Sequence, residues 1–206
     1  MSRSMIRNIS FGTLLASVVL TQLGCNSGST GSGKQSSKKQ HKAEVAPIPT
    51  PQDVVEKMLE MAGVTADDVV YDLGSGDGRI VIAASKKYGC KAVRYEIEPE
   101  LVKKSQENAR AAGVEDLVSI EERDIFTVDI SGATVVTLYL LPDMNLLLVP
   151  QLEKLKPGSR IVAHDSGIQG YRPDETVRME SVEDESRHTI YLWKTPLRKG
   201  TREEGE

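Results

Sequence analysis

The stretch VVYDLGSGDGRI, residues 69–80, decides how the rest of the chain is interpreted. A short apolar run ends in an acid, Asp72, and three alternating glycines follow it. Such a run before a glycine-rich turn is typical of a buried strand that leads into a helix. The turn therefore predicts a ligand site beyond the carboxyl end of a strand in a parallel sheet.

Strand and helix patterns alternate outward from this turn. We expect helices at 50–63, 78–89, 99–113 and 143–158, and strands at 69–73, 91–97, 117–122, 133–141 and 159–165. This alternation predicts an α/β fold whose parallel sheet carries helices on both faces. Two further strand-like segments, 176–184 and 187–196, predict an antiparallel hairpin that closes one sheet edge.

The starts of two helices carry capping signals. Thr50 is the expected N-cap of the first helix, Pro51 its first residue, and Asp53 the acid of a capping box. Asp143 is the expected N-cap of the helix at 143–158.

The glycine spacing separates several kinds of ligand site. A dinucleotide turn has the pattern G-x-G-x-x-G, but here Arg79 stands where the third glycine would fall. A phosphate loop would need Gly-Lys-Ser/Thr, which is absent. Asp72 and Asp77 would repel a pyrophosphate and suit a cation. S-adenosylmethionine, with a sulfonium, an ammonium and no phosphate, fits this turn.

The segment VVYDLGSGDG resembles the first motif of class I S-adenosylmethionine-dependent methyltransferases. The resemblance implies a Rossmann-like, mostly parallel seven-stranded sheet. It implies that Glu96, at the end of the second strand, holds both ribose hydroxyls, since a carboxylate accepts two O–H donors. It implies that Asp124 reaches the adenine amino group. The cofactor-binding residues it implies are Asp72, Gly74, Ser75, Gly76, Gly78, Glu96, Asp124 and Ile125.

A narrower resemblance covers segments 47–64, 72–84 and 135–165. They are similar to the lysine methyltransferase family that modifies small membrane proteins such as the ATP synthase c subunit, and to its bacterial relatives. This implies that Thr50 belongs to a lid over the cofactor. The segment TLYLLP replaces the Asn-Pro-Pro-Tyr motif of enzymes that methylate nucleic-acid amines, so base methylation is not expected.

The segment TLYLLP is also expected to form one side of a channel for the methyl acceptor. Leu140, Leu141 and Pro142 are expected to line an apolar channel, which favours a neutral lysine amine by desolvation. Tyr139 is the candidate catalytic residue, orienting the amine by its hydroxyl; alternatively it packs at the strand end. His164 and Asp165 either face the substrate or are structural.

Cysteines and histidines give no metal-ligand spacing. The chain has Cys25 and Cys90, and its histidines are His41, His164 and His188. No metal site is expected from this pattern. Cys90 and Trp193 are expected in the core.

The N-terminus differs in composition from the rest of the chain. Residues 1–25 contain an apolar run at 9–20 and end in TQLGC, which predicts a signal peptide or membrane anchor with Cys25 as a lipidation site. Residues 26–47 are rich in Ser, Gly and Lys and predict a disordered tether. The methyltransferase domain is expected at 48–197, followed by a flexible tail at 198–206. We therefore expect the protein to be associated with a membrane. Its domain is then either exported or held on the cytosolic side.

The net charge of −4 argues against a nucleic-acid partner, because phosphate backbones are bound by clustered Lys and Arg. Three functions remain open. The protein methylates a protein amine, most simply lysine; it methylates a small molecule; or it is a membrane-tethered cofactor-binding protein without catalysis.

Overall fold

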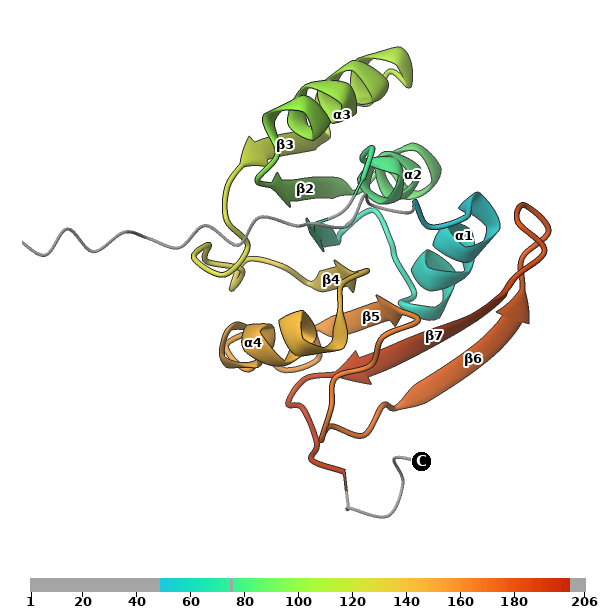
Figure 1. The fold of residues 1–206 in the computed structure, drawn as a ribbon. Coiled ribbons are helices and arrows are strands. Elements are labelled where there is room, and N and C mark those ends of the chain that lie inside the picture. Colours follow the sequence, from blue (N-terminus) through green and yellow to red (C-terminus); the bar gives the residue numbers. More distant parts are fainter. Residues whose placement is uncertain (1–48, 75, 201–206) are drawn as a thin grey trace, which may run out of the picture. The chain divides into compact units, whose positions relative to one another are not determined.

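The computed structural model describes residues 49–74 and 76–200. The expected leader, the Cys25 lipidation site, the tether, Ser75 and the last residues of the tail lie outside the described residues. Four helices and seven strands occur in the described part (Figure 1). Their bounds are α1 Gln52–Met61, β1 Val69–Leu73, α2 Arg79–Tyr88, β2 Lys91–Glu96, α3 Pro99–Ala111, β3 Val118–Glu122, β4 Val135–Leu138, α4 Pro142–Leu152, β5 Arg160–His164, β6 Glu175–Glu180 and β7 Arg187–Lys194.

All these strands belong to one sheet of order β3-β2-β1-β4-β5-β7-β6. The first five of them pair in parallel, whereas β7 pairs antiparallel with both β5 and β6. The order of the strands reverses between β1 and β4, where an open parallel sheet has its ligand crevice. The predicted fold class, including the C-terminal antiparallel hairpin, is confirmed.

Two apolar clusters cover the two faces of the sheet. Helices α1, α2 and α3 contribute to one cluster, for example through Val54, Val81 and Ala109. Helix α4 contributes to the other, which also holds Trp193. Neighbouring strand residues point to opposite clusters, as Val135 does to the first and Val136 to the second. Burial on both faces explains why the central strands read as continuous apolar runs.

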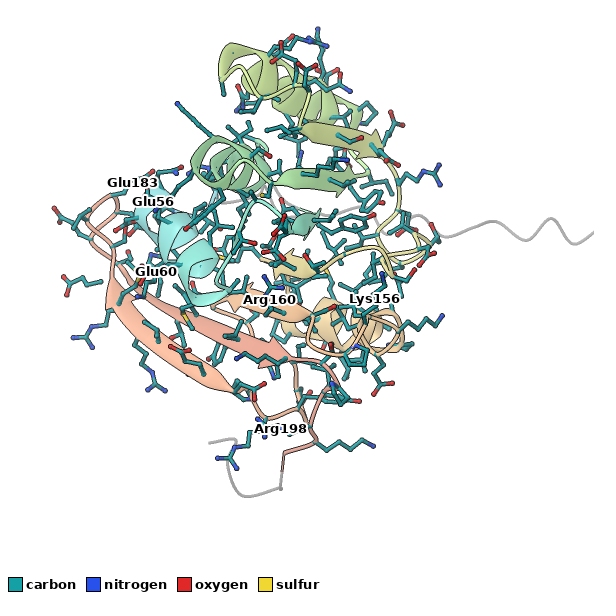
Figure 2. The ribbon with its side chains drawn as sticks, turned by 180° about the vertical axis from the view of Figure 1, so that it is seen from behind. Glu56, Glu60, Lys156, Arg160, Glu183 and Arg198 are labelled. Carbon is teal, nitrogen blue, oxygen red and sulfur yellow. The ribbon has the colours of Figure 1, made fainter. Side chains whose placement is uncertain are left out.

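The tip of the β6–β7 hairpin lies against the start of α1. Asp53 accepts hydrogen bonds from the Ser181 hydroxyl and the Val182 amide, each at 2.8 Å. The Gln52 amide donates to Glu183, which Figure 2 shows at the hairpin tip beside α1. The last two strands therefore fix the first helix, and with it the segment that precedes it.

The predicted caps of α1 and α4 are wrong in detail. The N-cap of α1 is Pro51, without a side-chain cap, and that of α4 is Leu141, followed by Pro142 in the first turn. The hydroxyl of Thr50 is used elsewhere, and Asp143 lies exposed in the first turn of α4.

The apolar run of β4 continues past the end of the strand. Strand β4 ends at Leu138, so Tyr139, Leu140 and Leu141 form a loop at its carboxyl end. No helix in the described ranges is long and apolar enough to cross a membrane.

Candidate active site

The glycine turn lies between β1 and α2, as the sequence predicts. Gly74, Gly76 and Gly78 all have positive φ, at 79°, 86° and 83°. A Cβ on Gly74 would lie 3.0 Å from Leu140, and one on Gly78 would lie 3.0 Å from the Ser105 Cβ of α3. The first glycine therefore leaves space beside the β4 loop, and the third allows α2 to pack on α3.

Asp77 is neutralised by a neighbouring side chain and offers no free charge to a ligand. Arg79 donates to both of its carboxylate oxygens, at 3.0 and 2.9 Å, and these bonds hold the pKa of Asp77 below its usual value against the effect of burial. Arg79 also donates to the Thr50 carbonyl at 2.7 Å. The turn is thus tied to the segment before α1, and Asp77 carries less free negative charge than the sequence argument assumed.

Asp72 is buried at the end of β1, with 1% of its surface exposed. One carboxylate oxygen accepts a hydrogen bond from Thr137 at 2.6 Å, and the other lies 3.8 Å from Arg94 Nε without a hydrogen-bond partner. Burial raises the pKa of Asp72 to about 7, although Arg94 and Thr137 oppose the rise. An unpartnered oxygen under the glycine turn is a position where a ligand ammonium or a water would fit.

Glu96 occupies the end of β2 and is 6% exposed. One carboxylate oxygen accepts the Ile97 and Glu98 amides at 2.9 and 3.0 Å, and the other accepts from Arg94 at 2.5 Å. Three of about four lone-pair positions are therefore occupied. The carboxylate is rigidly held, and a ribose diol would share its oxygens with Arg94 or displace that bond.

The third acid and the β4 loop approach the same turn. Asp124 follows β3 and uses one oxygen to accept the Phe126 amide at 2.9 Å. The adjacent Ile125 is buried, and its Cδ1 would lie 3.9 Å from a Cβ on Gly74. Predicted residues from the β1, β3 and β4 loops thus converge on Gly74.

The predicted lid and acceptor wall lie at the other side of the turn. Thr50 is buried, and its hydroxyl lies 3.1 Å from His164 Nδ1 at the end of β5. The Tyr139 ring packs on the His164 ring with centroids 4.1 Å apart. Burial raises the pKa of Tyr139, so its hydroxyl remains protonated at neutral pH. Leu141 is 60% exposed, and Pro142 is exposed, so both lie at the surface.

Comparison with known proteins decides the family. The model of the ANTKMT methyltransferase domain matches residues 72–175. A protein-lysine N-methyltransferase of Saccharolobus islandicus is 47% identical over 148 residues, which cover 71% of this chain and 91% of that protein. The chain belongs to the ANTKMT methyltransferase family. It is an S-adenosylmethionine-dependent methyltransferase, as the sequence predicted.

The chain is also similar to a second curated enzyme and to a solved structure. The ATP synthase c-subunit lysine N-methyltransferase of Mus musculus is 36% identical over 134 residues, covering 63% of this chain but only 52% of that protein. A crystal structure from Salinibacter ruber, described as an RNA methyltransferase in complex with S-adenosyl-L-homocysteine, is 48% identical. It has a TM-score of 0.66 and covers 77% of this chain and 99% of that one.

The residues around the glycine turn fit S-adenosylmethionine as cofactor. Gly76 has nothing within 4 Å of the position that a Cβ would take, Asp72 keeps a buried oxygen without a hydrogen-bond partner, and Glu96 and Asp124 stand at neighbouring strand ends. When bound, S-adenosylmethionine supplies a methyl group already activated by a sulfonium. These residues would hold its methionine part, ribose and adenine as the resemblance implies.

Sequence reasoning missed two residues of this region. Arg94 joins the two strand-end acids and donates to Ser105 at 2.5 Å, all within a buried network. The sequence does show an arginine at an apolar position of a buried strand. A buried arginine requires acidic partners. His188 was also missed, because its link to His164 depends on the pairing of β5 with β7.

Proposed function

We propose that this chain transfers a methyl group from S-adenosylmethionine to a lysine side chain of a protein. The observation that carries the proposal is the 47% identity to a protein-lysine N-methyltransferase, over nearly the whole of that protein. The geometry agrees with an amine acceptor, because the β4 loop places apolar side chains beside Tyr139 and the glycine turn.

The residues of this loop have distinct roles in the proposal. Leu140 lies beside Gly74 and would exclude water from the approaching amine. Desolvation lowers the pKa of a lysine, so the amine arrives with a free electron pair. The Tyr139 hydroxyl makes no hydrogen bond among the described residues and would orient that amine. In-line alignment then supplies most of the rate enhancement.

The acceptor class that we propose is a small membrane protein. The support is the ATP synthase component in the name of the mouse relative. Leu141, Leu146 and Leu147 expose 60%, 43% and 59% of their surface at the start and middle of α4, and each is available for apolar contact with such a protein.

RNA is the second candidate acceptor, because the 48% identical Salinibacter ruber structure is described as an RNA methyltransferase. The net charge of −4 and the absence of Asn-Pro-Pro-Tyr disfavour it. A small-molecule acceptor has no specific observation in its favour.

The test supplies both macromolecules to the full chain. Purified enzyme and methyl-labelled S-adenosylmethionine are incubated with a membrane-protein fraction and, separately, with total RNA. The proposal expects label in protein that is recovered as methyl-lysine after hydrolysis, and none in RNA. Label in nucleosides alone would support the RNA candidate and contradict the lysine proposal.

We also propose that the chain is held at a membrane through its N-terminus, with Cys25 lipidated. The support is the apolar run at 9–20 followed by TQLGC. Labelled fatty acid should be incorporated into the wild-type chain in cells and not into a Cys25→Ser variant. A chain that fractionates with soluble protein and carries no label would contradict this proposal.

A further inference from the structure

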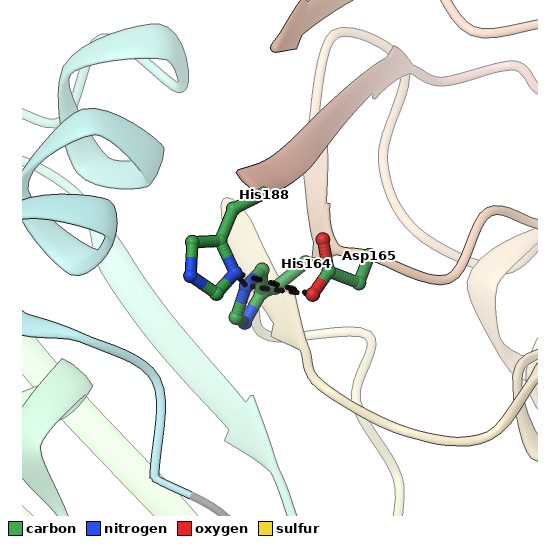
Figure 3. A group of neighbouring side chains, drawn as sticks. All are labelled: His164, Asp165 and His188. Carbon is green, nitrogen blue, oxygen red and sulfur yellow. Dashed lines mark hydrogen bonds and ion pairs between the residues drawn. The ribbon is translucent and has the colours of Figure 1, made fainter. Parts of the chain in front are cut away.

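Three side chains meet in a triangle at the end of β5. His164 Nε2 lies 2.8 Å from His188 Nδ1, and Asp165 Oδ2 lies 3.2 Å from each of these nitrogens (Figure 3). His164 is fully buried, His188 is 7% exposed and the Asp165 side chain is 38% exposed. The triangle is therefore enclosed by protein on the histidine side and open at the carboxylate.

The backbone holds the carboxylate in place. Asp165 adopts φ 55°, in the left-handed region, directly after β5. Its amide donates to the Thr189 carbonyl at 2.7 Å, and its other carboxylate oxygen accepts the Thr189 amide at 2.7 Å. These bonds leave Oδ2 to face the two imidazoles. A left-handed aspartate costs free energy, which the pairing of β5 with β7 offsets.

The outer nitrogen of each imidazole has its own partner. His188 Nε2 lies 3.2 Å from both Asp184 carboxylate oxygens, and His164 Nδ1 lies 3.1 Å from the Thr50 hydroxyl. Such outer carboxylate and hydroxyl partners fix the tautomer of metal-bound histidines in known metal sites. The Asp184 carboxylate only accepts, so it places N–H on His188 Nε2 and a lone pair on His188 Nδ1. The Thr50 hydroxyl can accept from His164 Nδ1 or donate to it, so both tautomers of His164 are compatible with this partner.

When the Thr50 hydroxyl accepts from His164 Nδ1, the inner triangle contains only acceptors. Two imidazole lone pairs and a carboxylate oxygen within 3.2 Å repel one another unless a positive charge lies between them. A metal ion or an additional proton on one imidazole supplies this charge. When the Thr50 hydroxyl donates instead, His164 Nε2–H donates to His188 Nδ1 at 2.8 Å, a hydrogen-bond length, and the triangle needs no cation.

The size and chemistry of the triangle suit zinc. Four-coordinate zinc with bonds of roughly 2.0–2.2 Å places its ligand atoms about 3.3 Å apart. The observed separations of 2.8 to 3.2 Å need only a small outward movement of the side chains. Two imidazoles and a carboxylate favour zinc over magnesium or calcium, which prefer oxygen ligands.

We propose that His164, Asp165 and His188 form a binding site for one zinc ion, with Thr50 and Asp184 orienting the histidines. The site would join β5, β7 and, through Thr50, the segment before α1 that is tied to the glycine turn. It lies beside Tyr139 and not at the strand-end acids implied for the cofactor. It is independent of the acceptor proposed above.

The test uses cobalt(II) as a spectroscopic probe for zinc. Untagged full-length chain is freed of metal with a chelator and titrated with cobalt in the presence of a thiol-free reductant. The proposal expects visible absorption bands of a four-coordinate site that saturate at one equivalent and disappear on addition of zinc. His188→Ala and Asp165→Asn should abolish the bands.

One further variant serves as a control, and another tests the outer partner of His188. His41→Ala, which removes the histidine outside the described residues, should retain the full bands. Asp184→Ala keeps all three ligands but loses an outer partner, and should weaken zinc binding roughly 10- to 100-fold. Circular dichroism establishes that each variant is folded; Asp165→Asn, at a partly exposed side chain, decides the outcome if His188→Ala does not fold.

A wild-type chain without the bands, or bands that persist at full strength in folded Asp165→Asn, would overturn the proposal. A comparison of ¹⁵N spectra of the chain before and after addition of zinc adds an independent readout. Histidine nitrogen resonances that do not change, with His188 protonated on both nitrogens, would assign the positive charge in the triangle to a proton.

Discussion

At the scale of single residues, Arg94 offsets the negative charge of the two acids at the ends of β1 and β2. It is fully buried, donates to Glu96 and lies 3.8 Å from Asp72. A buried cation between two carboxylates keeps the local charge close to balanced. The positive charge of a bound cofactor would therefore be recognised by particular oxygens rather than by an uncompensated acidic field.

Removing the β2 acid should weaken the cofactor. Glu96→Ala removes the acceptor implied for the ribose and leaves Arg94 without its 2.5 Å partner. Loss of hydrogen bonds to a charged group corresponds to roughly 10- to 100-fold weaker binding of S-adenosylhomocysteine. Calorimetric titration measures it.

Glu100→Ala, an exposed acid on the adjacent helix, is the matched control for Glu96→Ala and should bind like the wild type. Unchanged affinity in folded Glu96→Ala would mean that the ribose is held elsewhere.

The third glycine should be sensitive to a single added methyl group. In Gly78→Ala the new Cβ meets the Ser105 Cβ at 3.0 Å, in addition to the strain of φ 83°. We expect a loss of about 1–3 kcal/mol in the free energy of unfolding from overpacking, beyond that strain. Denaturant unfolding measures the loss.

Gly113→Ala is the matched control for Gly78→Ala, with φ 70° and nothing within 4 Å of the added Cβ. It should lose less stability than Gly78→Ala. Equal losses in the two variants would show that backbone strain alone, and not packing of α2 on α3, explains this glycine.

Individual residues were predictable where one local motif defined them. The positions of Gly74, Gly78, Glu96 and Asp124 followed from strand ends that the sequence shows directly. The partners of Thr50 and Asp53 did not, because both are bonded to residues distant in the sequence, on β5 and on the β6–β7 hairpin. A capping signal describes local geometry, and tertiary contacts replaced it here.

At the scale of elements, hydrogen bonds also join the amino ends of the central strands, at the end of the sheet opposite the glycine turn. Asp68, just before β1, accepts from Thr134 at 2.6 Å and from Arg160 of β5 at 2.7 Å. Arg160, labelled in Figure 2, also donates to the Ala62 carbonyl after α1 at 2.9 Å. One buried acid therefore connects the starts of β1, β4 and β5.

This acid should make stability depend on pH. Burial opposes ionisation of Asp68, but the Arg160, Thr134 and Thr65 bonds lower its pKa from 3.8 to about 2. The folded state then binds fewer protons than the unfolded state between these values. Its stabilisation is complete above about pH 4 and is lost as the pH falls through about 2.

Asp68→Asn should remove this component, which amounts to about 2 kcal/mol at neutral pH. Urea unfolding between about pH 2 and 6 measures it, with Asp67→Asn, an exposed neighbour, as the control. Parallel stability–pH curves for the wild type and Asp68→Asn would contradict the assignment.

Elements were predictable because their apolar patterns are long and their boundaries carry glycine or proline. Strand β4 was predicted too long, since the apolar run continues into the loop at Tyr139 to Leu141. These residues lie outside the sheet, in the loop that we expect to line the acceptor channel. A run of apolar residues alone does not separate these two causes.

At the scale of the whole molecule, the fold explains why distant segments form one site. Strand order reverses between β1 and β4, where an open parallel sheet binds its ligand, and the antiparallel hairpin fixes α1 and the segment before it. The lid, the glycine turn and the β5 end are thus joined through Thr50. The class of reaction was predictable from motifs; the His164–His188 contact required strand order, which no local pattern shows.

We expect the glycine turn at Gly74 to bind S-adenosylmethionine and no dinucleotide. Calorimetric titration of the full chain with S-adenosylhomocysteine, and in parallel with NADH, tests this expectation most directly. We expect saturation at one S-adenosylhomocysteine per chain and no binding heat with NADH. Absence of S-adenosylhomocysteine binding, or saturable binding of NADH in its place, would contradict it.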